Sequence, residues 1–186
     1  MADNILSLDM SLILTEELEL LRHGFDDHSL QVVINEHWGS HFPNHRDSIQ
    51  KDLQSKTSLI DFSVSHTIDL GGYFASEKKH QRIGFDIERA DRISKQVARR
   101  ICKSDQEAEA APSPASLWTA KESAFKALKG PWQPRVLSEI VLKDWMMHSY
   151  YETCGIQNAQ KYETCVAKGI ILKKAFHVFS FFIVQP

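Results

Sequence analysis

The chain has 186 residues, of which 42% are hydrophobic and 25% charged, and its formal net charge is -2 at pH 7. These values are ordinary for a globular protein, and they exclude a strongly basic protein that binds nucleic acid through a general positive field. Three scattered cysteines are too few for a disulfide framework or a zinc ribbon and suit a reducing compartment.

The first half of the chain alternates short predicted helices and strands. The apolar run Ile5–Leu14 is interrupted by Asp9 and has no basic leader, so we expect neither a signal peptide nor a membrane span, and a cytoplasmic location. The leucines of 11–22 predict an amphipathic helix entered from Thr15. Further predicted elements are a strand at Leu30–Ile34, a helix at Asp47–Gln54 and strands at Leu59–Val64 and Gly71–Ala75.

A polar connector at 76–81 is the expected boundary between an N-terminal lobe, 1–80, and a C-terminal lobe, 81–186. The whole chain predicts an α+β fold, which the second half continues. Its elements are a strand at Ile83–Glu88, a helix at Arg92–Lys103, a short helix after a capping box at 104–107, a helix capped by Ser113 that ends at Gly130-Pro131, and strand-like segments at 139–145 and 161–184.

Three carboxylates in two short motifs are the most informative feature. Asp86 and Glu88 are two apart in a predicted strand and therefore share a face. Glu122 and Lys126 are one turn apart on the predicted helix. Close carboxylates with lysine nearby suit Mg²⁺ shared with a phosphate substrate, so the motifs predict a metal-assisted phosphoryl-type site.

Each motif alone also has a plain structural interpretation. Asp86 and Glu88 could be exposed acids on an edge strand, and Glu122 and Lys126 could form a surface ion pair that contributes only ~0.2–0.5 kcal/mol. The predicted helix Arg92–Lys103 carries five basic and no acidic residues, which indicates either a solvated face or a docking surface for an acidic partner.

Histidines offer a second kind of signal. Ser65-His66-Thr67 follows a predicted strand, where the histidine is structural or donates to a phosphate together with its hydroxyl neighbours. His37, His41 and His45 have the four-residue spacing of a zinc site. Gly39 and Pro43 interrupt any helix that would align them, so zinc is disfavoured.

The chain resembles the 4′-phosphopantetheinyl transferases, especially the longer pseudo-dimeric type. That family shows a Ser-His after a first-half strand, then G-x-D-x-E, then W-x-x-K-E-x-x-x-K. Here the motifs are Ser65-His66, GFDIE at 84–88 and WTAKESAFK at 118–126, in the family's order and spacing. The resemblance implies two similar α+β lobes joined head to tail, although the first lobe is short for this type.

The resemblance also implies roles for individual residues. Asp86, Glu88 and Glu122 would hold Mg²⁺ with the coenzyme A pyrophosphate, and Glu122 would also act as general base. Lys126 would lie against the phosphates. The implied contacts to the 3′-phosphate of coenzyme A are Ser65 and His66, helped by Lys121, with Arg46 or Lys51 as further basic contacts. The implied carrier-protein contacts are Arg92, Lys95, Arg99 and Arg100.

The activity that the resemblance implies is holo-[acyl-carrier-protein] synthase chemistry. A monomeric enzyme would move phosphopantetheine from coenzyme A to a serine of an apo acyl or peptidyl carrier, in fatty-acid, polyketide or peptide synthesis. Two other interpretations remain. One is a metal-dependent nuclease, although such sites usually place lysine two residues after an acid, on a strand. The other is a binding module without catalysis.

Overall fold

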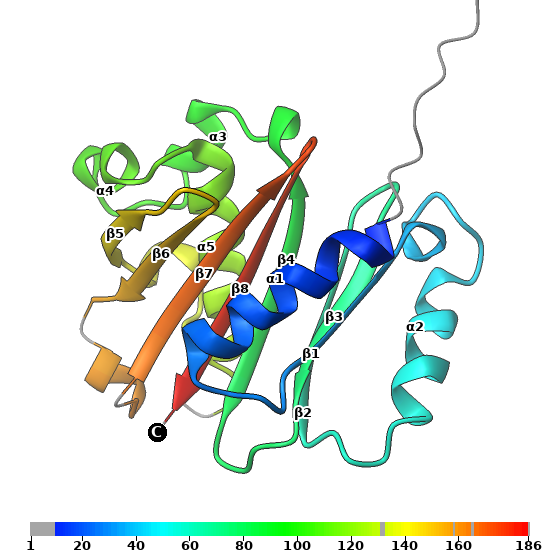
Figure 1. Ribbon diagram of the computed structural model, residues 1–186. Helices are drawn as coiled ribbons and strands as arrows, with labels where there is room; N and C mark the ends of the chain where they lie inside the picture. Colours follow the sequence, from blue (N-terminus) through cyan, green and yellow to red (C-terminus); the bar gives the residue numbers. More distant parts are fainter. Residues whose placement is uncertain (1–9, 131–132, 158, 165, 186) are drawn as a thin grey trace, which may run out of the picture.

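A computed structural model describes residues 10–130, 133–157, 159–164 and 166–185 of the protein, and the side chains from residue 17 onward. Two antiparallel sheets lie side by side (Figure 1). The N-terminal sheet has the order β1-β3-β2, with β1 at Gln31–Asn35, β2 at Asp61–His66 and β3 at Gly71–Ser76. The C-terminal sheet has the order β4-β8-β7-β6-β5, with strands at Arg82–Arg89, His177–Gln185, Val166–Lys174, Tyr151–Ile156 and Leu142–Met147. The predicted α+β class is confirmed.

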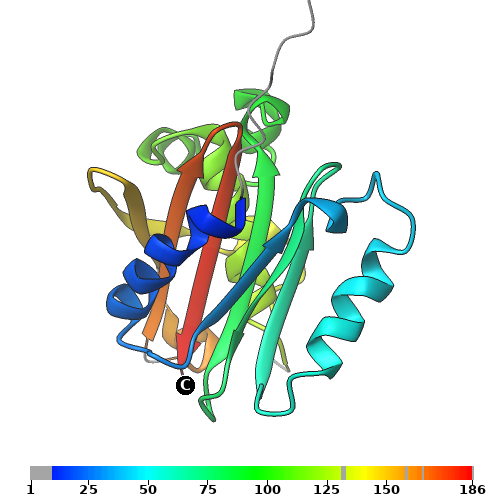
Figure 2. The ribbon, with the colours of Figure 1, turned by 45° about the vertical axis from the view of Figure 1, so that its right-hand side comes forward.

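The described residues form five α-helices, which pack around these sheets. They are α1 at Met10–Phe25, α2 at His45–Gln54, α3 at Lys95–Arg99, α4 at Asp105–Ala110 and α5 at Pro114–Ala127. The helix α1 crosses one face of the C-terminal sheet, whereas α5 lies behind the sheet and α2 flanks the N-terminal sheet (Figures 1 and 2). Among the described residues, no helix has the length and apolar character needed to cross a membrane.

The strand β8 is buried on both faces because it lies between the α1 and α5 layers. Phe179, Phe181 and Ile183 belong to the cluster that packs under α1. Phe182 and Val184 belong to the other cluster, together with the apolar face of α5. This explains the dense aromatic and β-branched sequence of the last strand, since a strand covered on both sides does not alternate with polar residues.

The helix α1 joins the two sheets through a shared core. Leu21 of α1 packs in one cluster with Phe74 of β3 and Phe85 of β4. The two sheets therefore bury apolar surface against each other as well as against their own helices. Unfolding of either sheet would expose this common core.

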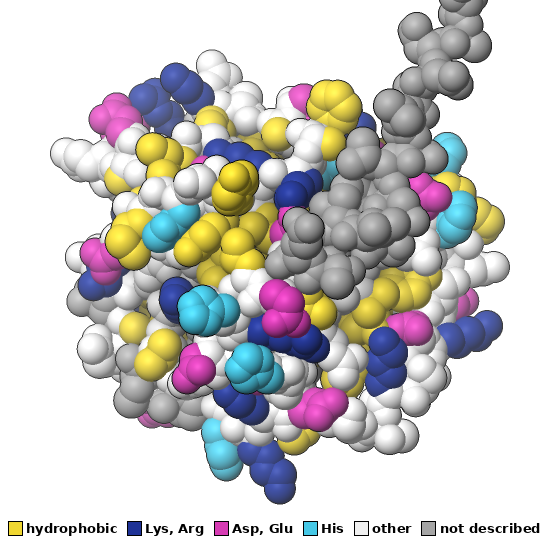
Figure 3. All heavy atoms as spheres, in the orientation of Figure 1, with side chains coloured by type: hydrophobic (Ala, Val, Ile, Leu, Met, Phe, Trp, Pro, Cys, Tyr) yellow, Lys and Arg dark blue, Asp and Glu magenta, His cyan; other side chains and the backbone are white. Residues whose placement is uncertain are grey.

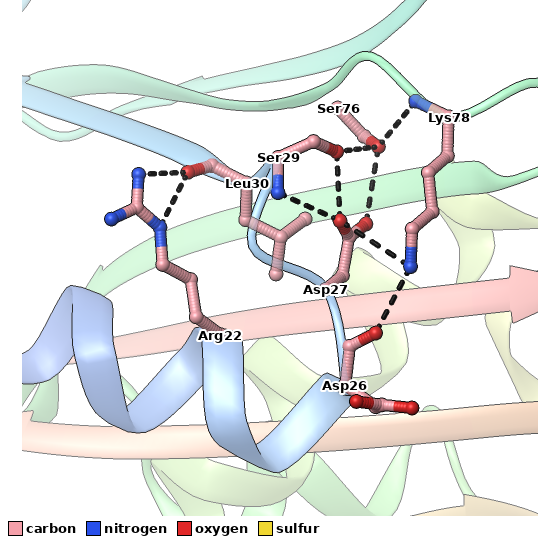
Figure 4. A network of polar contacts seen from close by, with 7 residues as sticks. All are labelled: Arg22, Asp26, Asp27, Ser29, Leu30, Ser76 and Lys78. Carbon is pink, nitrogen blue, oxygen red and sulfur yellow. Dashed lines mark hydrogen bonds and ion pairs between the residues drawn. The ribbon is translucent and has the colours of Figure 1, made fainter.

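A polar network fixes the turn from α1 into β1 (Figure 4). The buried Asp27 carboxylate accepts the backbone N–H of Ser29 at 2.9 Å and its hydroxyl at 2.7 Å. Ser76, at the end of β3, donates to the same carboxylate at 3.3 Å, and the Lys78 ammonium lies 3.5 Å away. Burial opposes ionisation of Asp27, but the Ser29 hydrogen bonds and Lys78 outweigh it and keep its pKa below the ordinary value.

The two sheets meet where β2 runs beside β4, a contact that we call the seam. β4 is an edge strand, so its outward backbone N–H groups need partners from outside its own sheet. Side chains of β2 supply them in steps of two residues, each 22 positions before its donor. The bonds are Ile83 N–H to Asp61 Oδ2 at 2.8 Å, Phe85 N–H to Ser63 Oγ at 2.9 Å and Ile87 N–H to Ser65 Oγ at 3.1 Å.

Several predicted boundaries are wrong. The predicted helix Arg92–Lys103 is the five-residue α3, because Ser94 is extended and caps a new helix by accepting from Val97 N–H at 3.3 Å. After Arg99 the chain continues in tight turns, with i to i−3 bonds up to Cys102. The helix α1 begins before Thr15, and α5 ends at Ala127, before the predicted end at Gly130.

The C-terminal strands also differ from prediction. The segment 161–184 contains two strands, β7 and β8, joined through Ala175 in a left-handed conformation (φ 49°). The strand β6 was not predicted. Two predicted features, most of the apolar run Ile5–Leu14 and the helix stop at Pro131, lie outside the residues whose side chains are described.

Candidate active site

The acids of the GFDIE segment project from β4 toward α5. Ile83, Phe85 and Ile87 pack in the core under α1, so the alternate residues Gly84, Asp86 and Glu88 face the other side. The predicted common face of Asp86 and Glu88 therefore exists, and it is the face that α5 covers.

Gly84 lets α5 approach β4 closely. A Cβ atom at this position would lie 1.7 Å from the Ser123 carbonyl oxygen and 2.7 Å from the Ala127 nitrogen, both backbone atoms of α5. Any side chain at residue 84 would therefore push the helix away from the strand. Since α5 carries Glu122 and Lys126, this glycine sets their distance from Asp86.

The sequence of α5 explains which of its faces meets the acids. Ser113 caps the helix by accepting from Ser116 N–H at 3.1 Å, and Pro114 occupies its first turn. The apolar face of α5 is buried, since Leu117, Ala124 and Leu128 are at most 1% exposed. Glu122 and Lys126 are only half-buried.

Lys126 joins the two motifs directly. Its ammonium donates to Asp86 Oδ1 at 2.8 Å and to the Phe85 carbonyl at 2.9 Å. Among the described ion pairs Lys126 has Asp86 as partner and not Glu122, so the simple i,i+4 surface pair considered above is not formed. The strand and helix motifs thus meet in one polar site.

The three carboxylates lie in an environment that disfavours their negative charge. Burial raises the pKa of Asp86 against the opposing effect of Lys126. For both Glu88 and Glu122, burial and then the charge of Asp86 raise the pKa. A cation placed among the three groups would relieve both effects.

The donor set offers a free oxygen ligand for a hard cation such as Mg²⁺, but the described side chains do not yet form a complete set of ligands. Asp86 Oδ2 is buried and has no hydrogen-bond partner among the described atoms, so it is available as an oxygen ligand. As they stand, however, no three described His, Cys, Asp or Glu side chains gather in an arrangement that could hold a metal ion. The metal assignment of Asp86, Glu88 and Glu122 thus stays a prediction.

A cavity of about 590 Å³ opens between α2 and β2, on the face of β2 opposite to Ser63 and Ser65. Arg46 and His66 line it together with apolar side chains that include Phe62 and Val64, and the exposed Lys51 is not among the lining residues. Burial, and then the positive charges of His45, Arg46 and Lys126, lower the pKa of His66. The positive potential that disfavours a charged imidazole also attracts an anion to this end of the cavity.

A sequence model of the 4′-phosphopantetheinyl transferase superfamily matches residues 82–176, just over half of the chain. The chain belongs to this superfamily. The matched segment includes both acidic motifs and the whole of α5. Membership identifies the protein as a transferase and supports the transfer of phosphopantetheine to carrier proteins, with coenzyme A as the family's substrate. A comparison with curated proteins gave no match.

Lys121 of the transferase cannot bind the 3′-phosphate of coenzyme A, so its predicted role is wrong. It is 0% exposed, and its ammonium makes three contacts of 2.6 Å inside the protein. The acceptors are the carbonyls of Ile101 and Ile140 and the carboxylate of Glu107. All three ammonium donors are therefore used within the fold.

Ser65 is also placed differently from the prediction. It is 6% exposed, and its hydroxyl accepts from Ile87 N–H and donates to Asp86 Oδ1 at 2.9 Å. Its single proton is used in the second bond, so Ser65 has no donor left for a phosphate. His66, the next residue on the strand, points to the opposite face and lines the cavity.

The predicted carrier-binding residues of the transferase are exposed around α3. Figure 3 shows Lys and Arg side chains at the upper edge of the molecule, around α3, with an acidic side chain beside them. Arg99 lies 3.4 Å from Asp105 and 3.9 Å from Glu109, so its charge is partly balanced. Arg92 acts on the acidic site, where its charge opposes the rise in the pKa of Glu88.

His45 is a site residue that the sequence did not indicate beyond the disfavoured zinc triplet. Its ring centre lies 4.9 Å from that of His66, and its Nε2 has no hydrogen-bond partner among the described atoms. His45 begins α2 and is followed by Arg46. This pair of basic residues would have indicated an anion site only if α2 had been known to pack beside β2.

Proposed function

We propose that this transferase moves 4′-phosphopantetheine from coenzyme A to a serine of an apo acyl or peptidyl carrier protein, releasing adenosine 3′,5′-bisphosphate. The observation that carries the proposal is the meeting of the two acidic motifs through Lys126 and Asp86, at 2.8 Å, close to a cavity lined by Arg46 and His66. We also assign the chain to the longer pseudo-dimeric type, acting as a monomer. The N-terminal sheet, which precedes the matched segment, supports this assignment.

Glu122 is the general base in this proposal. A serine hydroxyl is a poor nucleophile near neutral pH, so its proton must be removed as it attacks the β-phosphate of coenzyme A. The half-buried Glu122 carboxylate lies near Asp86 and Lys126 at the border of the site, where it would accept that proton. No covalent enzyme intermediate is needed.

Asp86, Glu88 and Glu122 would hold Mg²⁺, and Lys126 would lie beside the same phosphates. The bound cation supplies positive charge that offsets the pyrophosphate and its leaving group. Lys126 is 29% exposed and already bonded to Asp86, so its ammonium borders both the carboxylates and the solvent side of the site. Positioning and electrostatics then account for most of the rate enhancement.

His66 and Arg46 bind the 3′-phosphate of coenzyme A in this proposal, so His66→Ala should impair the use of coenzyme A selectively. Loss of a hydrogen bond to a charged group costs about 1.5–3 kcal/mol, so we expect KM for coenzyme A to rise about tenfold or more. KM for dephospho-coenzyme A, which lacks that phosphate, should change little. Steady-state kinetics with both substrates measure the difference, and exposed His41→Ala serves as the control. An equal rise for both substrates would contradict the assignment.

The basic residues Arg92, Lys95, Arg99 and Arg100 form the carrier-binding surface in this proposal. Arg100 is exposed and has no ion-pair partner among the described side chains. We expect Arg100→Glu to raise KM for the carrier about tenfold at low salt, with KM for coenzyme A unchanged. Lys79→Glu, a reversal on the 77–81 connector at the other end of the molecule (Figure 1), is the matched control. If both variants behave alike, net charge and not this surface governs carrier binding.

Intact mass spectrometry tests the proposal as a whole. The protein is incubated with Mg²⁺, coenzyme A and an apo carrier protein, and the carrier should gain one phosphopantetheine in a reaction that a chelator stops. Cleavage of plasmid DNA would favour the nuclease interpretation. Binding of coenzyme A without a change in carrier mass would favour a binding module.

A further inference from the structure

Two serines of β2 make the same contact across the seam, but one of them makes a second contact. Ser63 and Ser65 each accept a backbone N–H of β4, at 2.9 and 3.1 Å. Ser65 also donates its hydroxyl proton to Asp86 Oδ1 at 2.9 Å. Both serines are buried, so neither bond is exchanged with solvent.

The second contact determines which oxygen of Asp86 stays available. Oδ1 accepts from Ser65 and from Lys126, whereas the buried Oδ2 has no partner among the described atoms. The carboxylate is thus held by one oxygen, with the other free to bind a cation. Mutation of a group that orients a metal ligand in this way typically lowers metal affinity about 10–100-fold.

We propose that Ser65 is a positioning residue, contributed by the N-terminal sheet, that orients the Asp86 carboxylate for a divalent cation. The inference rests on the proposed function and replaces the predicted phosphate contact of Ser65. It also gives the seam a purpose beyond stability, because a side chain of one sheet completes the acidic site of the other.

The test compares Ser65→Ala with Ser63→Ala, since each variant loses one bond to a backbone N–H of β4 and only the first also loses the bond to Asp86. Mn²⁺ is titrated into each protein with coenzyme A present, and free Mn²⁺ is followed by electron paramagnetic resonance. We expect Ser65→Ala to raise the Kd for Mn²⁺ about 10–100-fold and Ser63→Ala to leave it nearly unchanged. Ser65→Thr, which keeps the hydroxyl, should restore most of the affinity.

Each other outcome overturns the inference. Equal loss of Mn²⁺ affinity in both alanine variants would show that the serines act only on the stability of the seam. A loss in Ser65→Ala of discrimination between coenzyme A and dephospho-coenzyme A, with Mn²⁺ affinity intact, would restore the phosphate contact. The proposed function fails separately: wild-type protein would then leave the carrier mass unchanged, whatever the Mn²⁺ titrations show.

Discussion

A Glu122→Gln variant should lose transfer activity by about 10²–10⁴-fold while keeping its fold. Glutamine has nearly the shape of glutamate but neither accepts a proton nor carries the charge that a cation requires. Glu122 is half-buried at the border of the site, and none of the described hydrogen bonds that hold α5 in place uses its side chain. The change should therefore affect chemistry and not stability.

Intact mass spectrometry of the carrier gives the rate for this variant, and thermal unfolding checks its fold. Glu77→Gln is a suitable control, because it removes the same charge from the exposed 77–81 connector, at the other end of the molecule from α3 (Figure 1). Transfer by Glu122→Gln at the parent rate would remove Glu122 from the site. A large fall in melting temperature would mean that the residue stabilises the fold instead.

The shared faces of the motif residues could be predicted from the sequence, because strand and helix periodicity alone determine which side chains lie on one face. Alternation along β4 places Asp86 and Glu88 on one face, and helical spacing places Glu122 and Lys126 on one side of α5. The pairing of Lys126 with Asp86 could not be predicted in the same way. It depends on the close approach of α5 to Gly84, which is a tertiary contact. The residues that this contact brings together are far apart in the sequence, and Phe85 and Lys126, which are hydrogen-bonded, are 41 positions apart.

The two wrong assignments have a common cause, since a motif does not say which side of its element faces the substrate. Ser65 and His66 are neighbours on a strand, so only one of them can line the cavity. Helical spacing places Lys121 on the same face as the apolar residues Leu117, Ala124 and Leu128, which are buried. The sequence thus contained a sign that Lys121 is internal, although its partner Glu107 lies in a separate helix.

Other differences arise where the local signal is weak or absent. The turn between β7 and β8 contains no glycine, proline or asparagine that would mark it in the sequence. Ala175 instead takes the left-handed conformation that glycine normally adopts. The end of α3 is set by the fold around it, since the Ile101 carbonyl that follows it accepts from Lys121. Neither feature can be predicted from a pattern in the sequence.

Lys121→Met should destabilise the protein by about 3–5 kcal/mol, the usual cost of removing one partner of a buried ion pair. Methionine fills similar space but leaves the buried Glu107 carboxylate without its ammonium partner. The carbonyls of Ile101 and Ile140, which Lys121 connects to α5, also lose their hydrogen-bond donor. Denaturant unfolding measures the loss, and the region around α3 and α4 should become more susceptible to proteolysis.

The double variant Lys121→Met, Glu107→Gln separates this explanation from simple loss of packing. Removing the second charge should recover part of the lost stability, because the uncompensated buried carboxylate is gone while the amide can still accept from Lys103 N–H, which donates to Glu107 at 2.9 Å. A variant as unstable as Lys121→Met would assign the loss to packing. Normal stability of Lys121→Met, with a raised KM for coenzyme A, would instead return Lys121 to the substrate site. The free energy of unfolding therefore decides between a residue that holds α5 in place and one that binds the substrate.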